Sequence, residues 1–236
     1  MAKHELLNNI DHKDLKIKTE RSDALGDSVM YCGSFAFEFR NLQAHYPIFF
    51  HRDASTNKFH AVALFGLESH ENLFLTPKGW DAAYIPMAME MQPFLIGFQG
   101  QATGDGQTVI HIDMDSPRVS DSDGEPVFLP KGGNTPYLTK IAGILDAVHA
   151  GSDYNQDFMD TLMRHDLLEP FTLDIELNDG SKNRLVGFHT INEEKLYALN
   201  ADALGELNSK GYLQPIYMAV ASLSNVAALI ARKNEV

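Results

Sequence analysis

The predicted fold is organised around two neighbouring sequences, WDAAYIPMAMEMQPFLIGF at residues 80–98 and VIHIDMDSPRV at residues 109–119. The first contains the only tryptophan and three of the nine methionines of the chain. Proline lacks the amide hydrogen that a helix interior needs, so Pro86 suits the first turn of a helix and Pro93 suits its end. We therefore expect a short helix that begins near Ile85 and is followed by two strands.

Two β-hairpins are predicted, one on each side of this stretch. The first is indicated by two apolar strands around a turn sequence, and the second by alternating apolar and polar residues. The first joins residues 48–51 to residues 59–65 across the turn sequence RDASTNK. The second joins residues 171–177 to residues 185–191 across NDGS. Both turns are rich in residues that favour tight backbone reversals.

Helical patterns dominate the C-terminal half. Side chains that cap helix N-termini occur at four places, and apolar residues recur at helical spacing near the C-terminus. The four caps are Thr135, Asp153, Asn192 and Asn200, and the last helix covers residues 216–230. This order predicts an α+β fold, with a mixed or antiparallel sheet in the N-terminal half, a helical C-terminal part and one late β-hairpin.

Length and composition suit a single domain over residues 1–236, of which 44% are hydrophobic. The longest predicted loop, residues 116–133, is the candidate boundary between two subdomains. Acidic residues outnumber basic ones by 32 to 19, which gives a net charge of −13. Because this charge repels phosphate backbones, we expect no nucleic-acid partner.

The sequence also favours a cytoplasmic protein that does not span a membrane. Cys32 is the only cysteine, so no internal disulfide forms. The first residues contain no apolar run of signal-peptide length. The most apolar segment, residues 216–231, is interrupted by polar residues and is shorter than a bilayer requires.

Polar side chains lie at alternate positions of the predicted strand at residues 108–114. Because strand side chains alternate, His111 and Asp113 point to the same face. Such a pair supplies two ligands of the facial triad of non-haem iron oxygenases, and His189 is the candidate for the third. Fe(II) would then be the cofactor. The alternative is that these residues form the solvent-facing side of a half-buried strand and bind no cofactor. This is the commoner reason for a His-x-Asp sequence in a strand.

Four residues are candidates for binding a ligand. Trp80 and Tyr84 belong to an aromatic and methionine-rich segment that suits a groove for a peptide, although the same spacing suits a buried core. Asp115 and Arg118 stand where the long loop begins. Arg118 is suited to holding a substrate carboxylate or to pairing with a nearby acid.

Seven segments, taken in order along the chain, resemble the bacterial SapC family: EFRNLQAHYPIFF, ENLFL, GWDAAYIP, QPFLIGF, HIDMDSPRV, PFTLDIELNDGSKNRLVGFHTINEEKL and GYLQPIYMAVASLSN. Each segment is weak evidence alone, whereas the ordered set is specific. The resemblance runs from about Leu6 to Lys233 and so covers nearly the whole chain.

The resemblance implies a role and no mechanism. The family is named for an association with surface-layer biogenesis in one bacterial group, and it is distinct from the SapC permeases of peptide import. Similar proteins are encoded near halogenase-like proteins, cupin-like oxygenases and TonB-dependent receptors, which implies an accessory role in modification or uptake. In relatives the segment that matches residues 111–115 is acidic, but a histidine is not a fixed part of it, which weakens the iron hypothesis.

The leading hypothesis is therefore an accessory protein without a cofactor, which binds a protein or peptide partner. Self-association into a homo-oligomer is a further hypothesis. No nucleophile motif stands out, and we assign no catalytic residues. The competing hypothesis is an iron-dependent oxygenase that uses His111, Asp113 and His189. A surface-layer component is the third.

Overall fold

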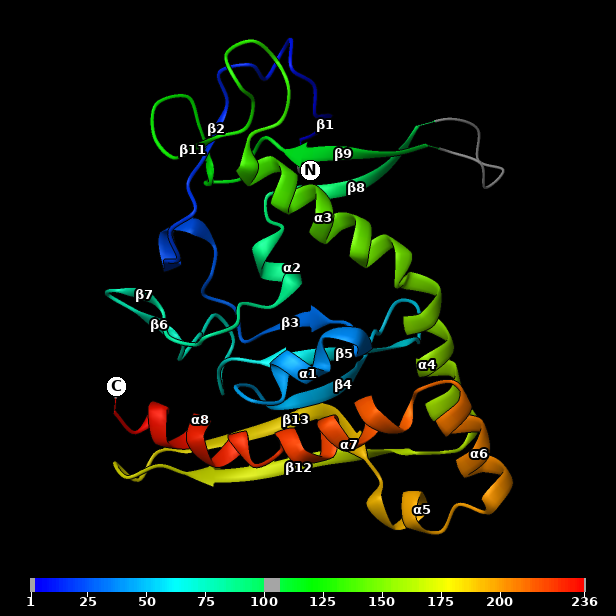
Figure 1. Cartoon of the computed structure of the whole chain (residues 1–236). Helices are drawn as coiled ribbons and strands as arrows, with labels where there is room; N and C mark the ends of the chain where they lie inside the picture. The colour runs from blue at the N-terminus through cyan, green and yellow to red at the C-terminus, as the bar shows by residue number, and fades with distance from the viewer. Residues whose placement is uncertain (1–2, 100–106, 236) are drawn as a thin grey trace.

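A computed structural model describes residues 3–99 and 107–235. The chain forms two parts, which lie one above the other in Figure 1. The larger part (residues 25–90 and 152–235) and the smaller part (residues 3–20, 91–99 and 107–150) each enclose a cluster of buried hydrophobic side chains. The antiparallel sheets and the C-terminal helices confirm the predicted α+β class.

The sheet of the larger part is antiparallel, in the spatial order β12-β13-β4-β5-β3. Its strands are β3 (Tyr31–Ser34), β4 (Ile48–Arg52), β5 (Phe59–Leu64), β12 (Leu168–Glu176) and β13 (Lys182–Ile191). The pairs β4-β5 and β12-β13 confirm both predicted hairpins. The late hairpin joins the early one because Phe188 of β13 pairs with His51 of β4.

The two central strands, β4 and β5, form the middle of the larger core. Phe49, Phe50, Val62 and Leu64 are fully buried, so both faces of these strands are covered. Aromatic and β-branched side chains favour a pleated sheet, and strands buried on both faces lose their polar alternation. Each buried phenylalanine contributes on the order of 1.5–3 kcal/mol to the hydrophobic stabilisation.

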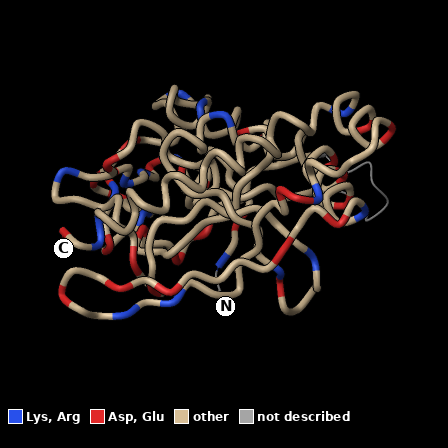
Figure 2. The backbone as a smooth tube through the Cα atoms, turned by 90° about the horizontal axis from the view of Figure 1, so that it is seen from below, with Lys and Arg blue, Asp and Glu red and all other residues tan. Residues whose placement is uncertain are grey.

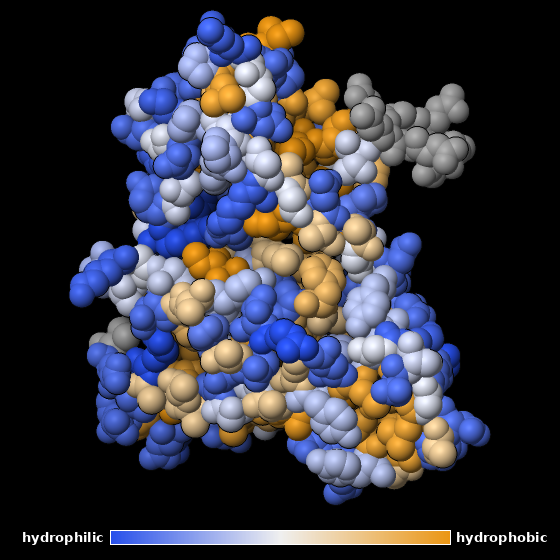
Figure 3. All heavy atoms as spheres, in the orientation of Figure 1, coloured by the Kyte–Doolittle hydropathy of each residue, from blue (hydrophilic) through white to orange (hydrophobic). Residues whose placement is uncertain are grey.

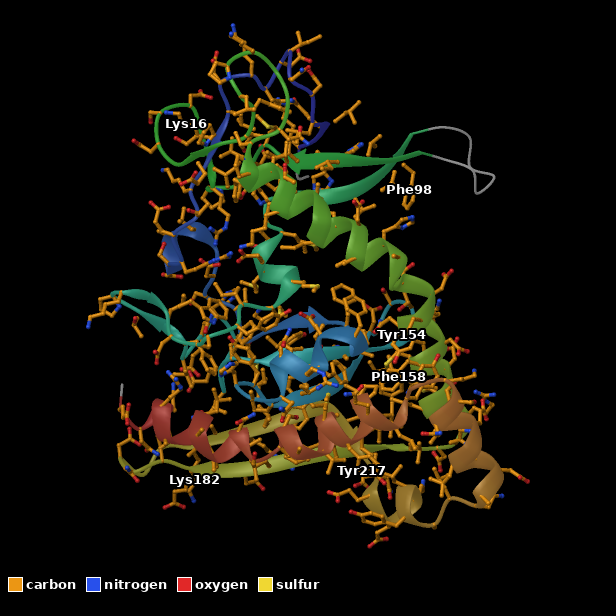
Figure 4. The ribbon with its side chains drawn as sticks, viewed as in Figure 1. Lys16, Phe98, Tyr154, Phe158, Lys182 and Tyr217 are labelled. Carbon is orange, nitrogen blue, oxygen red and sulfur yellow. The ribbon has the colours of Figure 1, made fainter. Side chains whose placement is uncertain are left out.

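Three helices pack around this sheet: α1 (Phe39–Leu42), α4 (Ser152–Arg164) and α7 (Leu213–Ser222). Helix α7 contacts β4 and β13, and the Ile48 amide donates a hydrogen bond of 2.9 Å to the Ser222 hydroxyl. Phe158 of α4 points into the core, as Figure 4 shows, where its ring meets the Phe39 ring edge-on.

The final helix is divided in two, whereas a single helix was predicted. Helix α7 ends at Ser222 and α8 (Asn225–Lys233) begins three residues later. The hydroxyl groups of Ser222 and Ser224 donate hydrogen bonds to carbonyl groups three residues earlier, which competes with regular helical bonding. Within the described residues, the stretch Leu213–Lys233 alone has the length and apolar composition of a membrane-spanning helix.

The smaller part contains two three-stranded sheets and one long helix. The first sheet has the order β1-β9-β8, and β2 is the middle strand of the second. The elements are β1 (His4–Leu6), β2 (Lys16–Ile17), β8 (Phe94–Gln99), β9 (Gln107–Asp113), β10 (Val119–Ser120), β11 (Glu125–Pro126) and α3 (Pro136–Ala150). Ile17, Ile112 and Ile141 meet in its core and are fully buried.

The segment 116–133 is part of the smaller part. Its two short strands, β10 and β11, flank β2, and Val127 is buried in the smaller core. The chain passes between the two cores at other places, which are 17–29, 89–91 and 145–154.

Three of the four predicted helix caps are confirmed. Thr135 accepts a hydrogen bond from the Leu138 amide at the start of α3, and Asn192 and Asn200 cap α5 (Glu193–Tyr197) and α6 (Ala201–Ser209). The prediction for Asp153 was wrong, because α4 begins at Ser152 and places Asp153 in its first turn. A carboxylate there still favours the helix through the helix dipole.

The helix predicted near Ile85 is only one turn long, α2 (Met87–Glu90), with Pro86 just before it. Pro93 closes the segment, and the two prolines leave room for little more than this turn. A small hairpin, β6 (Leu75–Thr76) and β7 (Gly79–Trp80), precedes it. Helix α2 lies between the larger sheet and α3 (Figure 1), and so belongs to the junction of the two parts.

Candidate functional site

Two adjoining cavities lie at this junction, and together we call them the central cleft. The first has a volume of about 340 Å³ and is lined by Ala83, Tyr84, Ile85, Met87, Glu90, Lys140 and Ile144. The second has a volume of about 150 Å³ and is lined by Lys18, Thr19, Arg21, Ile85, Glu90, Gln92, Arg118 and Tyr137. Both therefore use Ile85 and Glu90. Figure 3 shows hydrophobic atoms gathered where the two parts meet.

The first cavity is mainly apolar. Tyr84, Ile85 and Met87 enter it from the segment around α2, and Ile144 enters it from α3. The charged groups of Glu90 and Lys140 contact each other at its edge. An apolar space with a few polar groups at its rim is the usual form of a small-ligand or side-chain binding site.

The second cavity is lined by a buried arginine. Arg118 is 1% exposed, and its guanidinium donates hydrogen bonds of 3.0 Å to the carbonyl groups of Lys18 and Glu20. It also contacts the carboxylate of Asp27 at 2.5 Å. Asp27 is fully buried, and its second oxygen accepts a hydrogen bond from the Ser22 amide. Arg118 thus holds the chain that enters the larger part.

A second arginine connects this ion pair to α2. Arg21 lies 3.3 Å from Asp27 and 2.8 Å from Glu90, and it donates a hydrogen bond to the Met89 carbonyl. Lys140 of α3 reaches the other oxygen of Glu90. Burial alone would raise the pKa of Glu90, but Lys140 and Arg21 lower it overall, so Glu90 is charged at neutral pH.

The cleft is positively charged although the protein is acidic. Four cationic side chains line it, Lys18, Arg21, Arg118 and Lys140, whereas two carboxylates face them, those of Glu90 and Asp27. Elsewhere, as Figure 2 shows, acidic and basic residues are scattered over the molecule, and the acidic ones are more numerous. An anionic group is therefore attracted to the cleft more than to the rest of the surface.

Tyr84 joins the cleft to a buried carboxylate. Its hydroxyl donates a hydrogen bond of 2.8 Å to Glu38, which is 1% exposed and also accepts from the amides of Met87 and Phe35. Burial raises the pKa of Glu38, and three donors oppose that shift. Glu38 thus anchors both α2 and Tyr84 beside the apolar cavity.

The other predicted binding residues lie outside the cleft. Trp80 packs in the larger core, where its ring meets Phe65 at 5.1 Å and its Nε1–H donates to the Tyr46 hydroxyl at 2.7 Å. Asp115 is exposed and accepts a hydrogen bond from the Lys3 amide. Of the four candidates, Tyr84 and Arg118 therefore reach one cleft, and Trp80 and Asp115 do not.

The three residues of the iron hypothesis are not brought together. His111 and Asp113 lie on β9 of the smaller part, whereas His189 lies on β13 of the larger part and pairs with Phe50. The His111 ring lies over Gly97 of β8, since a Cβ at Gly97 would come within 2.6 Å of His111 Nε2. Among the described residues, no group of three His, Cys, Asp or Glu side chains is placed to hold a metal ion.

Arg21, Asp27, Glu90 and Lys140 had no signal in the sequence. Each looks like an ordinary surface charge. Three of the ion pairs join residues 50 to 91 positions apart, and only Arg21 and Asp27 are near in sequence, six positions apart. The sequence offers one cue to the buried charges: Glu38 lies between two aromatic residues, and Arg118 follows a proline. Only the packing of the two parts against each other reveals the cleft.

Comparison with known proteins places the chain in a family. Searches of curated proteins and of solved structures found no match. The model of the SapC family matches residues 7–229. That match covers both parts of the molecule and every residue of the central cleft, and the chain therefore belongs to the SapC family.

Proposed function

We propose that this protein is an accessory binding protein that takes a segment of a protein or peptide partner into the central cleft. The observation that carries the proposal is the position of a 340 Å³ apolar cavity next to a cationic one, with Ile85 and Glu90 shared between them. An apolar side chain fits the first cavity, and a carboxylate beside it is attracted by Arg21 and Lys140.

Charge supports an anionic partner over a cationic one. A ligand carboxylate competes with Glu90 for Arg21 and Lys140, and Lys140 is the more exposed and hence more adaptable of the two. A ligand amine would meet four cations and two acids that are already paired. We therefore propose an acidic and apolar segment, acting in a surface-layer, uptake or modification system, with binding in the cytoplasm.

A panel of fluorescein-labelled hexapeptides tests the proposal by fluorescence anisotropy. The panel places phenylalanine or leucine next to glutamate, next to lysine, or at a free C-terminal carboxylate. We expect the anionic apolar peptides to bind and the lysine peptides to bind at least tenfold more weakly. Ile144→Glu should weaken binding at least tenfold, because it places a charge in the apolar cavity.

Thr139→Glu is the matched control, since it adds the same charge to an exposed position of the same helix outside the cleft. It should leave the affinity within about twofold. Equal weakening by both variants would show general repulsion and would overturn the cleft as the site. Binding that prefers lysine peptides would overturn the proposed chemistry.

A further inference from the structure

The five-stranded sheet places two histidines side by side. His51 of β4 lies directly opposite His60 of β5, and their ring centres are 5.3 Å apart. Opposite residues on antiparallel strands point to the same face, so both rings lie on one side of the sheet. Both are half-buried. The pair is far from the central cleft along the chain and shares no residue with it.

Aromatic rings hold His51 in place. Tyr31 stacks on it at 5.5 Å and Phe188 lies against it at 5.9 Å. Both rings keep part of their surface exposed to solvent. The rings are thus oriented by packing and remain accessible from solvent on one side, which lowers the cost of ordering them around an ion.

Both rings have nitrogen atoms suited to a metal ion. Nδ1 of His51 is buried and has no hydrogen-bond partner in the described chain. Burial and the neighbouring His51 lower the pKa of His60, so its ring is neutral at pH 7. A neutral imidazole nitrogen with a free lone pair is the form that binds metals.

The spacing of the rings suits a shared ion. With zinc–nitrogen bonds of about 2.0–2.1 Å, two imidazoles on one tetrahedral ion hold their ring centres about 5 Å apart. The observed separation is 5.3 Å. Imidazole ligands favour zinc, copper and nickel over magnesium and calcium, which prefer oxygen ligands.

Among residues 3–99 and 107–235, no group of three His, Cys, Asp or Glu side chains that could hold a metal ion includes this pair. His51-Arg52-Asp53 is a second His-x-Asp sequence, but Oδ1 of Asp53 already accepts hydrogen bonds from the amides and hydroxyls of Ser55 and Thr56. His189 lies on the opposite face, since it pairs with Phe50 and not with His51. An ion held by two histidines keeps open positions for water or for a donor atom from another molecule.

We propose that His51 and His60 bind one divalent transition-metal ion of the zinc, nickel and copper class. Isothermal titration of untagged, metal-free protein with Zn²⁺ tests this directly. We expect one ion per chain, with at least a tenfold loss of affinity in His51→Ala and in His60→Ala. His149→Ala, which removes a solvent-exposed histidine of α3, should change the affinity by less than twofold. Mg²⁺ should not compete.

A second measurement uses the unmodified protein and so does not depend on the folding of a variant. Ni²⁺ is added while the histidine ring signals are followed by NMR. The rings of His51 and His60 should broaden first, before those of the other eight histidines. Earlier broadening of another ring, or unchanged Zn²⁺ affinity in a folded His51→Ala variant, would overturn the site.

Discussion

The two parts of the molecule are held together in different ways. The larger part has an aromatic core around β4 and β5, in which Phe49 and Phe50 are fully buried. The smaller part has a mainly aliphatic core, to which Phe94 adds a buried ring. The junction between them depends on buried charges, because Arg118 of the smaller part contacts Asp27 of the larger part.

This difference suggests that the hydrophobic cores stabilise the two parts, whereas the buried ion pair fixes their relative position. Hydrophobic burial is non-directional, so a core tolerates small shifts of its neighbours. A buried arginine is directional, because its planar guanidinium satisfies its partners in one geometry only. We therefore expect the aromatic core of the larger part to contribute most to the free energy of unfolding, and the Arg118–Asp27 pair to fix the position of the smaller part beside the cleft.

The strongest test of this contrast is Phe50→Ala. It removes a fully buried ring at the centre of the sheet and should lower the free energy of unfolding by about 3–5 kcal/mol. Urea denaturation followed by Trp80 fluorescence measures it, because the single tryptophan packs in the larger core. The exposed Val186→Ala variant is the control, and an equal effect of the two would contradict the assignment of the core.

Asp27→Ala tests the junction. It leaves the buried charge of Arg118 without a carboxylate and should cost about 3 kcal/mol, at the lower end for a broken buried pair, since the adjacent cavity admits water. Hydrogen exchange should increase at the junction more than in β5. Asp14→Ala, at an exposed position, should change the free energy of unfolding by less than about 0.5 kcal/mol. Equal values for the two aspartates would refute the proposed role of Asp27.

The smallest expected effect is a pH dependence confined to the larger sheet. Burial, first of all, lowers the pKa of both His60 and His189 from the ordinary value of 6.5. The unfolded chain then binds more protons as the pH falls, so this contribution to stability is present above pH 6.5 and is lost as the pH falls through the folded pKa.

Denaturation at pH 7.5 and at pH 5.5, in the presence of a chelator, measures that loss. The stability of His60→Asn should change less between the two pH values than that of the wild type. Because His60 is half exposed, we expect the difference to be smaller than for the two variants above. A larger pH dependence in the variant than in the wild type would contradict the proposed contribution of His60 to stability.

Short sequence patterns predicted most helices and strands well, but they predicted poorly which of these pack against each other. The two hairpins and three helix caps follow from turn residues, alternation and side chains that satisfy free amides, all of which act within a few residues. The failures were at Asp153, at the one-turn helix α2 and at the division of α7 from α8. Prolines at α2 and serine hydroxyl groups between α7 and α8 altered these boundaries by one turn or less.

The candidate site shows the same limit. Tyr84 and Arg118 were identified as candidates because an aromatic side chain and an arginine suit binding wherever they lie. Their partners Glu38, Asp27 and Arg21 were missed, because charge alone does not reveal which side chain becomes buried. The His-x-Asp pattern at His111 was recognised by sequence spacing, and His189 proved to lie in a different sheet.

By itself the sequence determined the fold class, both hairpins, the acidic charge and membership of the SapC family, since these depend on composition, on short-range backbone preferences and on the order of segments. Only the tertiary structure decided where two parts meet and which charges they bury between them. It also decided that His51 and His60, rather than His111 and His189, face each other. Contacts between distant residues depend on the register and packing of whole elements, which no local pattern encodes.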